Sequence, residues 1–419
     1  MPTDPSPHLG GLRAWLIWSL AALSFGYAFF QRVAPSVMVT ELMADFAIGG
    51  GMLGVLSALY FYPYVLLQIP LGALIDKLGA RALLVGALSV AGVGSLIFGM
   101  AEQLSVAYLG RILIGVGSGV GFLASLALAS KWFPPNRFAM LAGLTMFFGM
   151  MSGILAQAPL ALFVQKFGWR ASQWNLGAFG LGLALLIFLF VRNSPEERAA
   201  KTSKQDWGSI WSALGKAART LEVWKIALVA SAMTGPMLTL GGLWGTPFVM
   251  EAYGLERPYA AFLVSLMLLG WAFGAPFSGW LSDRLQRRRP LLIVGSGVIM
   301  IALACIIFLP NLSLYTVIAI LVIAGMAGGV MAVCFAQVRA VIPSEFSGAA
   351  LGIVNGMTVA SGAVLQPLVG AMLDYQWSGK MAAGSRVYAA SDYTTAFLLI
   401  LFVAGIGFLT SLRLRDQTV

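Results

Sequence analysis

The sequence predicts an all-α membrane protein in which twelve transmembrane helices form two pseudo-symmetric six-helix bundles. Three observations lead to this prediction. The composition is strongly apolar, the apolar residues fall into twelve continuous runs, and short patterns in the first half of the chain recur in the second half.

The composition indicates lipid as the main solvent of the chain. Hydrophobic residues make up 59% of the 419 positions and charged residues only 10%, whereas a soluble domain is about half apolar and about a quarter charged. A soluble fold of this size could not remove so much apolar surface from water. The net charge of +10 lies in short loops between apolar runs, so it does not indicate a nucleic-acid partner.

The cysteine and histidine content argues against disulfides, metals and cofactors. Cys305 and Cys334 lie inside predicted helices and give no disulfide framework. The one histidine, His8, lies in the polar N-terminal tail, which argues against a histidine-based metal or proton site.

Twelve apolar runs are long enough to cross a bilayer, which takes about 20 helical residues. They are continuous rather than alternating, which excludes the strands of a membrane β-barrel. The predicted spans are 14–38, 50–73, 82–101, 105–129, 139–165, 171–191, 223–250, 259–281, 290–309, 313–338, 348–373 and 393–412.

The longest polar interval, residues 192–222, separates a first bundle at 1–191 from a second bundle at 223–419. Part of this linker has the pattern of an amphipathic helix. Such a helix lies in the cytoplasmic membrane interface or packs on the underside of the protein. Its apolar face consists of Trp207, Ile210, Trp211, Leu214 and Ala218.

The two halves repeat in the same orientation. Gly279 and Asp283 follow Gly72 and Asp76 by 207 residues, and Gln366 follows Gln157 by 209. The pairs Gly115–Gly119 and Gly325–Gly329 are related by 210 residues. Matches at a nearly constant offset indicate duplication, and an even number of spans per copy makes the copies parallel.

The distribution of basic residues predicts the orientation. If the N-terminus is cytoplasmic, nineteen of the 26 lysines and arginines fall on the cytoplasmic side. We therefore expect both termini in the cytoplasm and the protein in the inner membrane.

Two copies of a charged loop motif follow spans two and eight. They read Gly72-x-Leu74-x-Asp76-Lys77-x-Gly79-x-Arg81 and Gly279-x-Leu281-Ser282-Asp283-Arg284-x-x-Arg287-Arg288-Arg289. Glycines allow close helix approach, and a carboxylate at a helix end can pair with basic residues across the gap and hold one conformation. The alternative is a solvated run of charges. The candidate gating residues are Gly72, Asp76, Arg81, Gly279, Asp283 and Arg284.

This motif pair resembles the loop motif of the major facilitator superfamily. The resemblance implies a transporter that works by alternating access, with two bundles rocking about a central site.

The segment from Gly110 through Arg111 to Gly119 resembles the fourth-helix motif of that family. An arginine inside a span is costly unless it faces a cavity or a partner, so Arg111 is a candidate for binding solute. The alternative is that it reaches the outer interface. The antiporter motif of the fifth helix is not matched between Gly149 and Pro159, which argues against drug–proton antiport.

In the first span, the segment from Tyr27 to Gln31 and Arg32 is similar to a pattern of the organic anion–cation symporter branch. This resemblance implies that the arginine faces the central cavity and binds a carboxylate of the solute. A guanidinium can bind a carboxylate through two parallel hydrogen bonds. Gln31 stands where that branch has an acid. The alternative is that Arg32 pairs with Glu41 or Asp45 at the outer rim.

Six further polar or aromatic side chains on cavity-type helices are candidates for contact with the solute. Helix packing or an interhelical hydrogen bond explains each of them equally well. They are Tyr60, Tyr64, Gln157, Trp244, Asn355 and Gln366.

No acid or histidine lies well inside any predicted span, whereas arginines do. This pattern favours uniport or exchange of a small anionic or zwitterionic organic solute, such as a carboxylate, a peptide-like compound or an organophosphate. A proton-coupled symporter of an organic anion is the main alternative, and an efflux antiporter is less favoured. An enzyme is disfavoured because no catalytic dyad or nucleotide motif is present. We expect a monomer whose partners are the solute and the lipid bilayer.

Overall fold

The computed structural model describes residues 9–195, 207–285, 287–309 and 312–415. Within them, twelve helical segments are long and apolar enough to cross a membrane, which confirms the predicted all-α class and the number of spans. The segments are Leu12–Val37, Gly50–Gln68, Ala80–Met100, Leu104–Trp132, Pro135–Leu155, Ala158–Phe190, Leu221–Tyr253, Arg257–Leu285, Arg289–Phe308, Leu314–Val341, Glu345–Gln376 and Ala390–Ser411.

The first half of the chain is built from interrupted helices. They are α1 (Leu12–Val33), η1 (Ala34–Val37), α2 (Val39–Asp45), α3 (Gly50–Ala58), α4 (Phe61–Leu78), α5 (Ala80–Met100), α6 (Leu104–Ser118), α7 (Gly121–Trp132), η2 (Pro135–Arg137), α8 (Phe138–Leu155) and α9 (Ala158–Phe190). Gly168, with φ of +83°, interrupts α9. This break lies between predicted spans five and six, so the start of α9 continues span five and the remainder is span six.

The second half follows the linker helix α10 (Trp207–Ala218). Its elements are α11 (Leu221–Thr239), the π-helical turn η3 (Leu240–Trp244), α12 (Gly245–Tyr253), α13 (Arg257–Leu285), α14 (Arg289–Phe308), α15 (Leu314–Gly329), α16 (Ala332–Val341), α17 (Ser344–Gln376), β1 (Met381–Ala382), β2 (Ser385–Arg386) and α18 (Ala390–Ser411). The strands pair antiparallel as a small hairpin that the sequence did not predict.

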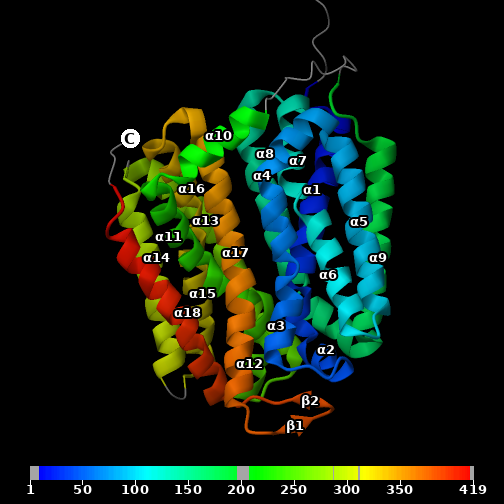
Figure 1. Ribbon diagram of the computed structural model, residues 1–419, viewed down its shortest axis with the longest axis vertical. Helices are drawn as coiled ribbons and strands as arrows, with labels where there is room; N and C mark the ends of the chain where they lie inside the picture. The colour runs from blue at the N-terminus through cyan, green and yellow to red at the C-terminus, as the bar shows by residue number, and fades with distance from the viewer. Residues whose placement is uncertain (1–8, 196–206, 286, 310–311, 416–419) are drawn as a thin grey trace, which may run out of the picture.

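The two halves stand side by side (Figure 1), with the first half in blue to green and the second in green to red. We call the end with α10 the linker end and the opposite end, with β1 and β2, the hairpin end. Helix α1 begins and α18 ends at the linker end, as an even number of spans requires.

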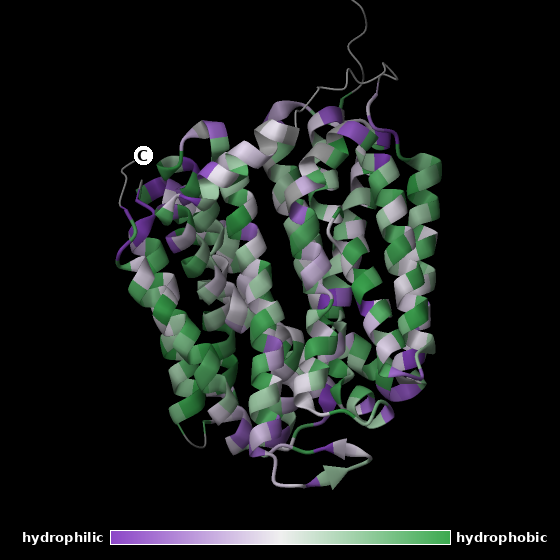
Figure 2. Cartoon of the chain, in the orientation of Figure 1, coloured by the Kyte–Doolittle hydropathy of each residue, from purple (hydrophilic) through white to green (hydrophobic). Residues whose placement is uncertain are grey.

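The outer surface is apolar along the helices, and polar residues gather at the two ends (Figure 2). Large side chains such as Leu66 and Phe402 are 71% and 69% exposed, respectively. Large exposed apolar surfaces are unusual on a soluble monomer. The exposure of these side chains therefore fits a hydrocarbon solvent.

The linker helix α10 packs against α17. Ala217 is fully buried, Trp211 is 61% exposed, and Lys216 lies 3.5 Å from Glu345 of α17. The predicted helix is therefore present and contacts the underside of the second half, while Trp211 is free to meet a membrane interface. The side chains of Trp207 and Ile210 lie outside the described part of the structure.

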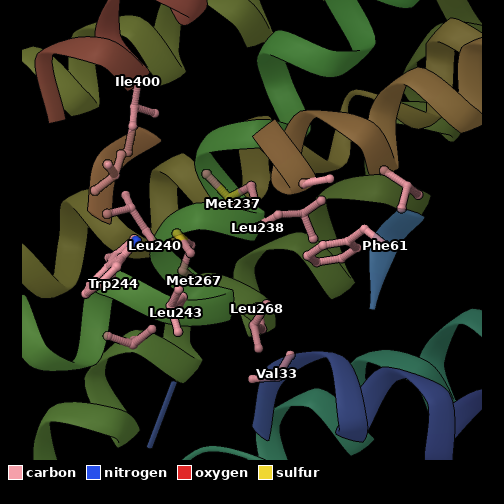
Figure 3. Packing of buried hydrophobic residues seen from close by; sticks show 14 of the residues in the cluster. Val33, Phe61, Met237, Leu238, Leu240, Leu243, Trp244, Met267, Leu268 and Ile400 are labelled. Atoms are coloured by element: carbon pink, nitrogen blue, oxygen red, sulfur yellow. The ribbon is translucent and has the colours of Figure 1, made fainter. Parts of the chain in front are cut away.

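The buried core is continuous across the two halves only toward the hairpin end. One cluster joins residues of both halves, with Val33 and Phe61 of the first half facing Leu238 and Leu268 of the second (Figure 3). The other cluster consists of first-half residues near the linker end. The halves therefore seal against each other at the hairpin end.

Candidate solute site and gates

Arg32 lies in the last turn of α1 and points into an aromatic cage. Its guanidinium carbon lies 4.8 Å from the ring centre of Phe29, 5.7 Å from that of Tyr60 and 5.1 Å from that of Tyr64. The residue is 7% exposed, and its buried Nε has no hydrogen-bond partner in the described chain. Aromatic faces stabilise a cation by about 0.5–2 kcal/mol each, but they do not supply the hydrogen-bond acceptor that Nε lacks.

Both acids that could have neutralised Arg32 at the rim are occupied by other arginines. The Glu41 carboxylate accepts from Arg257 at 2.5 Å. Asp45 pairs with Arg170 and accepts from the Trp169 indole. Partial burial raises the pKa of Asp45, but the hydrogen bonds from Trp169 and Arg170 and the charge of Arg170 lower it further. The pKa therefore lies below its ordinary value, and the acid remains charged. The cage therefore holds a guanidinium with no carboxylate partner among the described residues.

The interruption of span two places the tyrosines of the cage. Helix α3 ends at Ala58 and α4 begins at Phe61, so Tyr60 sits at the junction. Its hydroxyl donates to the Ala28 carbonyl at 2.8 Å, which ties the junction to α1. Its ring stacks on that of Tyr64, with 6.2 Å between the ring centres.

Arg111 has a different environment from Arg32. It is fully buried and donates to three backbone carbonyls: Gln31 at 3.1 Å, Ser57 at 3.2 Å and Leu56 at 3.4 Å. The last two carbonyls belong to the C-terminal turn of α3, where a positive charge is stabilising. Arg111 thus joins α1, α3 and α6, and does not lie at the outer interface.

Tyr27 and Gln31 take part in a buried network inside the first half. The Gln31 amide donates to the Tyr27 hydroxyl and to Ser95 Oγ, each at 3.0 Å. Ser95 in turn donates to the side chain and to the backbone carbonyl of Gln173 at 2.9 Å. The network faces α5 and α9. Ser95 and Gln173 were not singled out from the sequence, although each is a polar residue inside an apolar span.

Gln157, Gln366 and Trp244 gather around the break in span seven. Gln157 Nε2 donates to the Gly241 carbonyl and Gln366 Nε2 to the Leu238 carbonyl, both at 2.8 Å. The Trp244 indole donates to the Gln366 carbonyl at 2.9 Å. The bond from Gln157 crosses from the first half to the second.

Asn355 makes another bond between the halves. Its Nδ2 donates to Gln68 Oε1 at 3.3 Å, and Gln68 donates to the Gly119 carbonyl at 3.3 Å. This contact of α17 with α4 lies on the linker-end side of the Gln366 cluster.

The candidate gating residues lie together at the linker end, at the ends of α4 and α13 and the start of α5. Gly72, Asp283 and Arg284 are exposed, while Gly279 is half-buried. The side chain of Asp76 lies outside the described part of the structure, although its backbone continues α4. Arg81 donates to the Phe188 carbonyl at 2.5 Å, at the end of α9.

A candidate gate at the hairpin end, a set of polar contacts between the halves centred on Asp374, was not expected from the sequence. Asp374 lies near the end of α17, and its two oxygens accept from Gly50 N at 2.9 Å and Gly51 N at 2.8 Å, at the start of α3. A carboxylate at a helix N-terminus is stabilised by the free N–H groups and the helix dipole. The acid of one half therefore caps a helix of the other half.

Two further side chains complete this gate. Arg386 of β2 donates to Asp374 at 2.9 Å and Tyr388 donates at 2.6 Å. Burial and the hydrogen bond to Asp374 raise the pKa of Tyr388, so its hydroxyl remains a donor.

The sequence profile described as Major Facilitator Superfamily matches residues 20–367 and 239–418. The chain belongs to this superfamily. It is therefore a multi-pass membrane transporter rather than an enzyme.

Curated relatives within the superfamily share about a quarter of their residues with this chain. The probable sulfoacetate transporter SauU of Cupriavidus necator is 24% identical over 294 residues, which are 68% of each chain. The probable nitrate/nitrite antiporter NarK1 of Thermus thermophilus is 24% identical over 97% of this chain and 93% of its own. The chloroplastic ascorbate transporter of Arabidopsis thaliana is 24% identical over 66% of this chain and 53% of its own.

Solved structures of the superfamily share the fold. A bacterial homolog of the human lysosomal transporter Spinster, in an inward-facing and unoccupied conformation, superposes with a TM-score of 0.78 at 16% identity. The match covers 98% of this chain and 100% of that one. A D-xylose–proton symporter gives 0.73 at 15% identity and covers 96% and 97%.

Proposed function

We propose that this protein transports a small organic anion, and that Arg32 binds the anionic group inside its aromatic cage. One observation carries the proposal: Arg32 is a buried guanidinium without a carboxylate partner in the described chain. A buried, unpaired charge costs several kcal/mol. A carboxylate, sulfonate or phosphate on the solute would remove that cost through two parallel hydrogen bonds.

The names of the relatives support an anionic solute, which is organic in two of the three. Sulfoacetate, nitrate, nitrite and ascorbate appear in them, and all of these compounds are anions at neutral pH. In the cage of this protein, Tyr60 and Tyr64 would cover the apolar part of the solute, while Phe29 closes the side along α1.

In this proposal, some of the remaining candidate residues hold the helices around the site in place and the others gate access to it. Arg111 would hold the turn that carries Tyr60, and the network of Tyr27 and Gln31 would keep α1 against α5 and α9. Gln157, Gln366 and Trp244 would fix the break in span seven. Gly72, Asp76, Arg81, Gly279, Asp283 and Arg284 would gate the linker end.

We further propose that the linker end faces the cytoplasm in the inner membrane and that one chain is the transporting unit.

The described acids of the spans, such as Glu222, Glu251 and Asp374, lie in terminal turns. This favours uniport or exchange over proton symport, because a coupling acid normally lies within the cavity.

Purified protein in proteoliposomes provides the test. We would measure binding and uptake of sulfoacetate, ascorbate and small carboxylates, with D-xylose as the neutral comparison. Hydrogen bonds to charged groups contribute about 1.5–3 kcal/mol each, so Arg32→Ala should weaken anion binding about ten-fold to a hundred-fold. Arg32→Lys keeps the charge but loses the fork, and should give a smaller but clear loss.

Arg287→Ala is the matched control, since it removes an exposed arginine in the loop after α13. It should leave affinity unchanged. Unaltered anion binding by Arg32→Ala, or a preference for neutral solutes, would refute the proposed function. Uptake that stops when a pH gradient is collapsed would favour the proton-coupled alternative.

A further inference from the structure

A groove opens on the outer surface between α11 and α18 at the linker end. Its volume is about 420 Å³. The walls are apolar and include Leu228 of α11 with Ile406 and Leu409 of α18, while Trp224 stands at its edge and is 42% exposed. None of its lining residues belongs to the candidate solute site.

The rim of this groove is basic. Lys225 and Arg413 both line it. Within the described chain, no hydrogen bond or ion pair engages the exposed Arg413 side chain. Lys225 lies 2.8 Å from Glu222 and Arg415 lies 3.6 Å from the same carboxylate. Glu222 thus faces two of the three basic side chains at and beside the rim, Arg413 is the third, and the described side chains here keep a net positive charge.

The backbone adds to this positive field. Helix α11 begins at Leu221, which lines the groove, and its N-cap residue Thr220 supplies no side-chain acceptor. A helix N-terminus attracts anions through its free N–H groups and its dipole. The Trp224 indole donates to the Ala218 carbonyl at 2.6 Å, which holds the ring at the end of the span, and tryptophan is favoured at membrane interfaces.

From these features we infer that the groove is a binding site for an anionic phospholipid. One acyl chain lies along Leu228, Ile406 and Leu409, and the headgroup phosphate meets Arg413, Lys225 and the start of α11. Apolar walls that end in a basic rim match the two ends of such a lipid. A zwitterionic lipid offers the same chain, but its headgroup carries an ammonium that the rim would repel.

The site is distinct from the proposed solute site and is tested without transport. Detergent-purified protein would be titrated with phosphatidylglycerol or phosphatidylcholine, and the melting temperature and lipids retained in native mass spectra recorded. A ligand of the folded state raises its stability with concentration. We expect phosphatidylglycerol to raise the melting temperature and to be retained, and phosphatidylcholine to do so much less.

Two variants locate the effect. Arg413→Gln should weaken phosphatidylglycerol binding about five-fold, since each basic residue near an anionic surface contributes about 1 kcal/mol. Thr410→Trp fills the groove without changing its charge and should abolish retention. The control Arg287→Gln removes an equal charge from another exposed loop at the same end and should bind as wild type.

The lipid as a whole is required, so inorganic phosphate alone should have no effect. Equal stabilisation by both lipids would overturn the inference. So would stabilisation by inorganic phosphate, or equal losses in Arg413→Gln and Arg287→Gln.

Discussion

Gln157 and Gln366, which are 209 residues apart in the sequence repeat, both donate to the broken seventh span. They differ in what they connect. The Gln157 bond to Gly241 joins the first half to the second, whereas the Gln366 bond to Leu238 lies within the second half. Gln157 also accepts from Ser36 at 3.4 Å and Thr246 at 3.3 Å, one from each half.

The first prediction uses this difference. Gln157→Leu should shift the equilibrium toward opening of the hairpin end by about five-fold, because a net hydrogen bond contributes about 1 kcal/mol. Gln366→Leu should lower thermal stability without this shift. Spin-label distances across the hairpin end, in a background with Cys305 and Cys334 replaced by serine, would measure the shift. Similar shifts in the two variants would contradict the prediction.

The second prediction separates the two buried arginines. Arg111→Leu should destabilise the protein by about 3 kcal/mol, because its charged bonds to three carbonyls are lost. Arg32→Leu should leave stability unchanged or raise it, since an unpaired buried cation is removed. Unfolding in denaturant, followed by tryptophan fluorescence, would check both. Equal destabilisation would show that Arg32 is also part of the scaffold.

The third prediction concerns the gate at the hairpin end. Asp374→Asn should weaken the charge-assisted bonds to the start of α3 and favour a state open at that end. The expected change is about ten-fold, as for one bond to a charged group. Alkylation of a cysteine introduced at Ser36 would report the opening. Asp392→Asn is the control, because Asp392 caps its own helix through Ala389 N at 2.8 Å; an equal increase there would refute a specific gate.

The fourth prediction concerns the linker-end motifs. Asp76→Asn and Asp283→Asn should slow transport more than they weaken solute binding, because residues that bias a conformation act on its population. Arg32→Lys should show the opposite pattern. Uptake rates and binding constants measured on the same preparations would decide, and parallel losses of rate and affinity in the aspartate variants would indicate a binding role.

The sequence predicted the number and position of the spans well because lipid imposes a length and a composition on each of them. The first span was expected at 14–38 and lies at Leu12–Val37. The interruption at Tyr60 was not predicted, although Pro63 lies in the run 50–73 and lacks the backbone N–H that a continuous helix would need there. At this break the carbonyls of Leu56 and Ser57 accept from Arg111, which lies about fifty positions later in the chain.

The site was predicted less completely, for a geometric reason. Composition shows that Arg32 and Arg111 lie in spans, but not which side of each helix faces a partner. Arg111 donates to backbone carbonyls, which every residue has, so no sequence motif identifies its partners. No motif marks Asp374, and two of its partners are the backbone N–H groups of Gly50 and Gly51, which a pattern of side chains does not reveal.

The contact of Gly50 with Gly370 limits how closely the two halves can approach each other at the hairpin end. A Cβ placed on Gly370 would lie 2.1 Å from the Gly50 carbonyl oxygen, so the two backbones already touch. Side chains in contact can change rotamer when two helices approach, whereas backbone peptide groups have no such freedom. The backbones of α3 and α17 therefore have a fixed smallest separation at this end. The energy of this contact depends on rigid surfaces rather than on compressible ones.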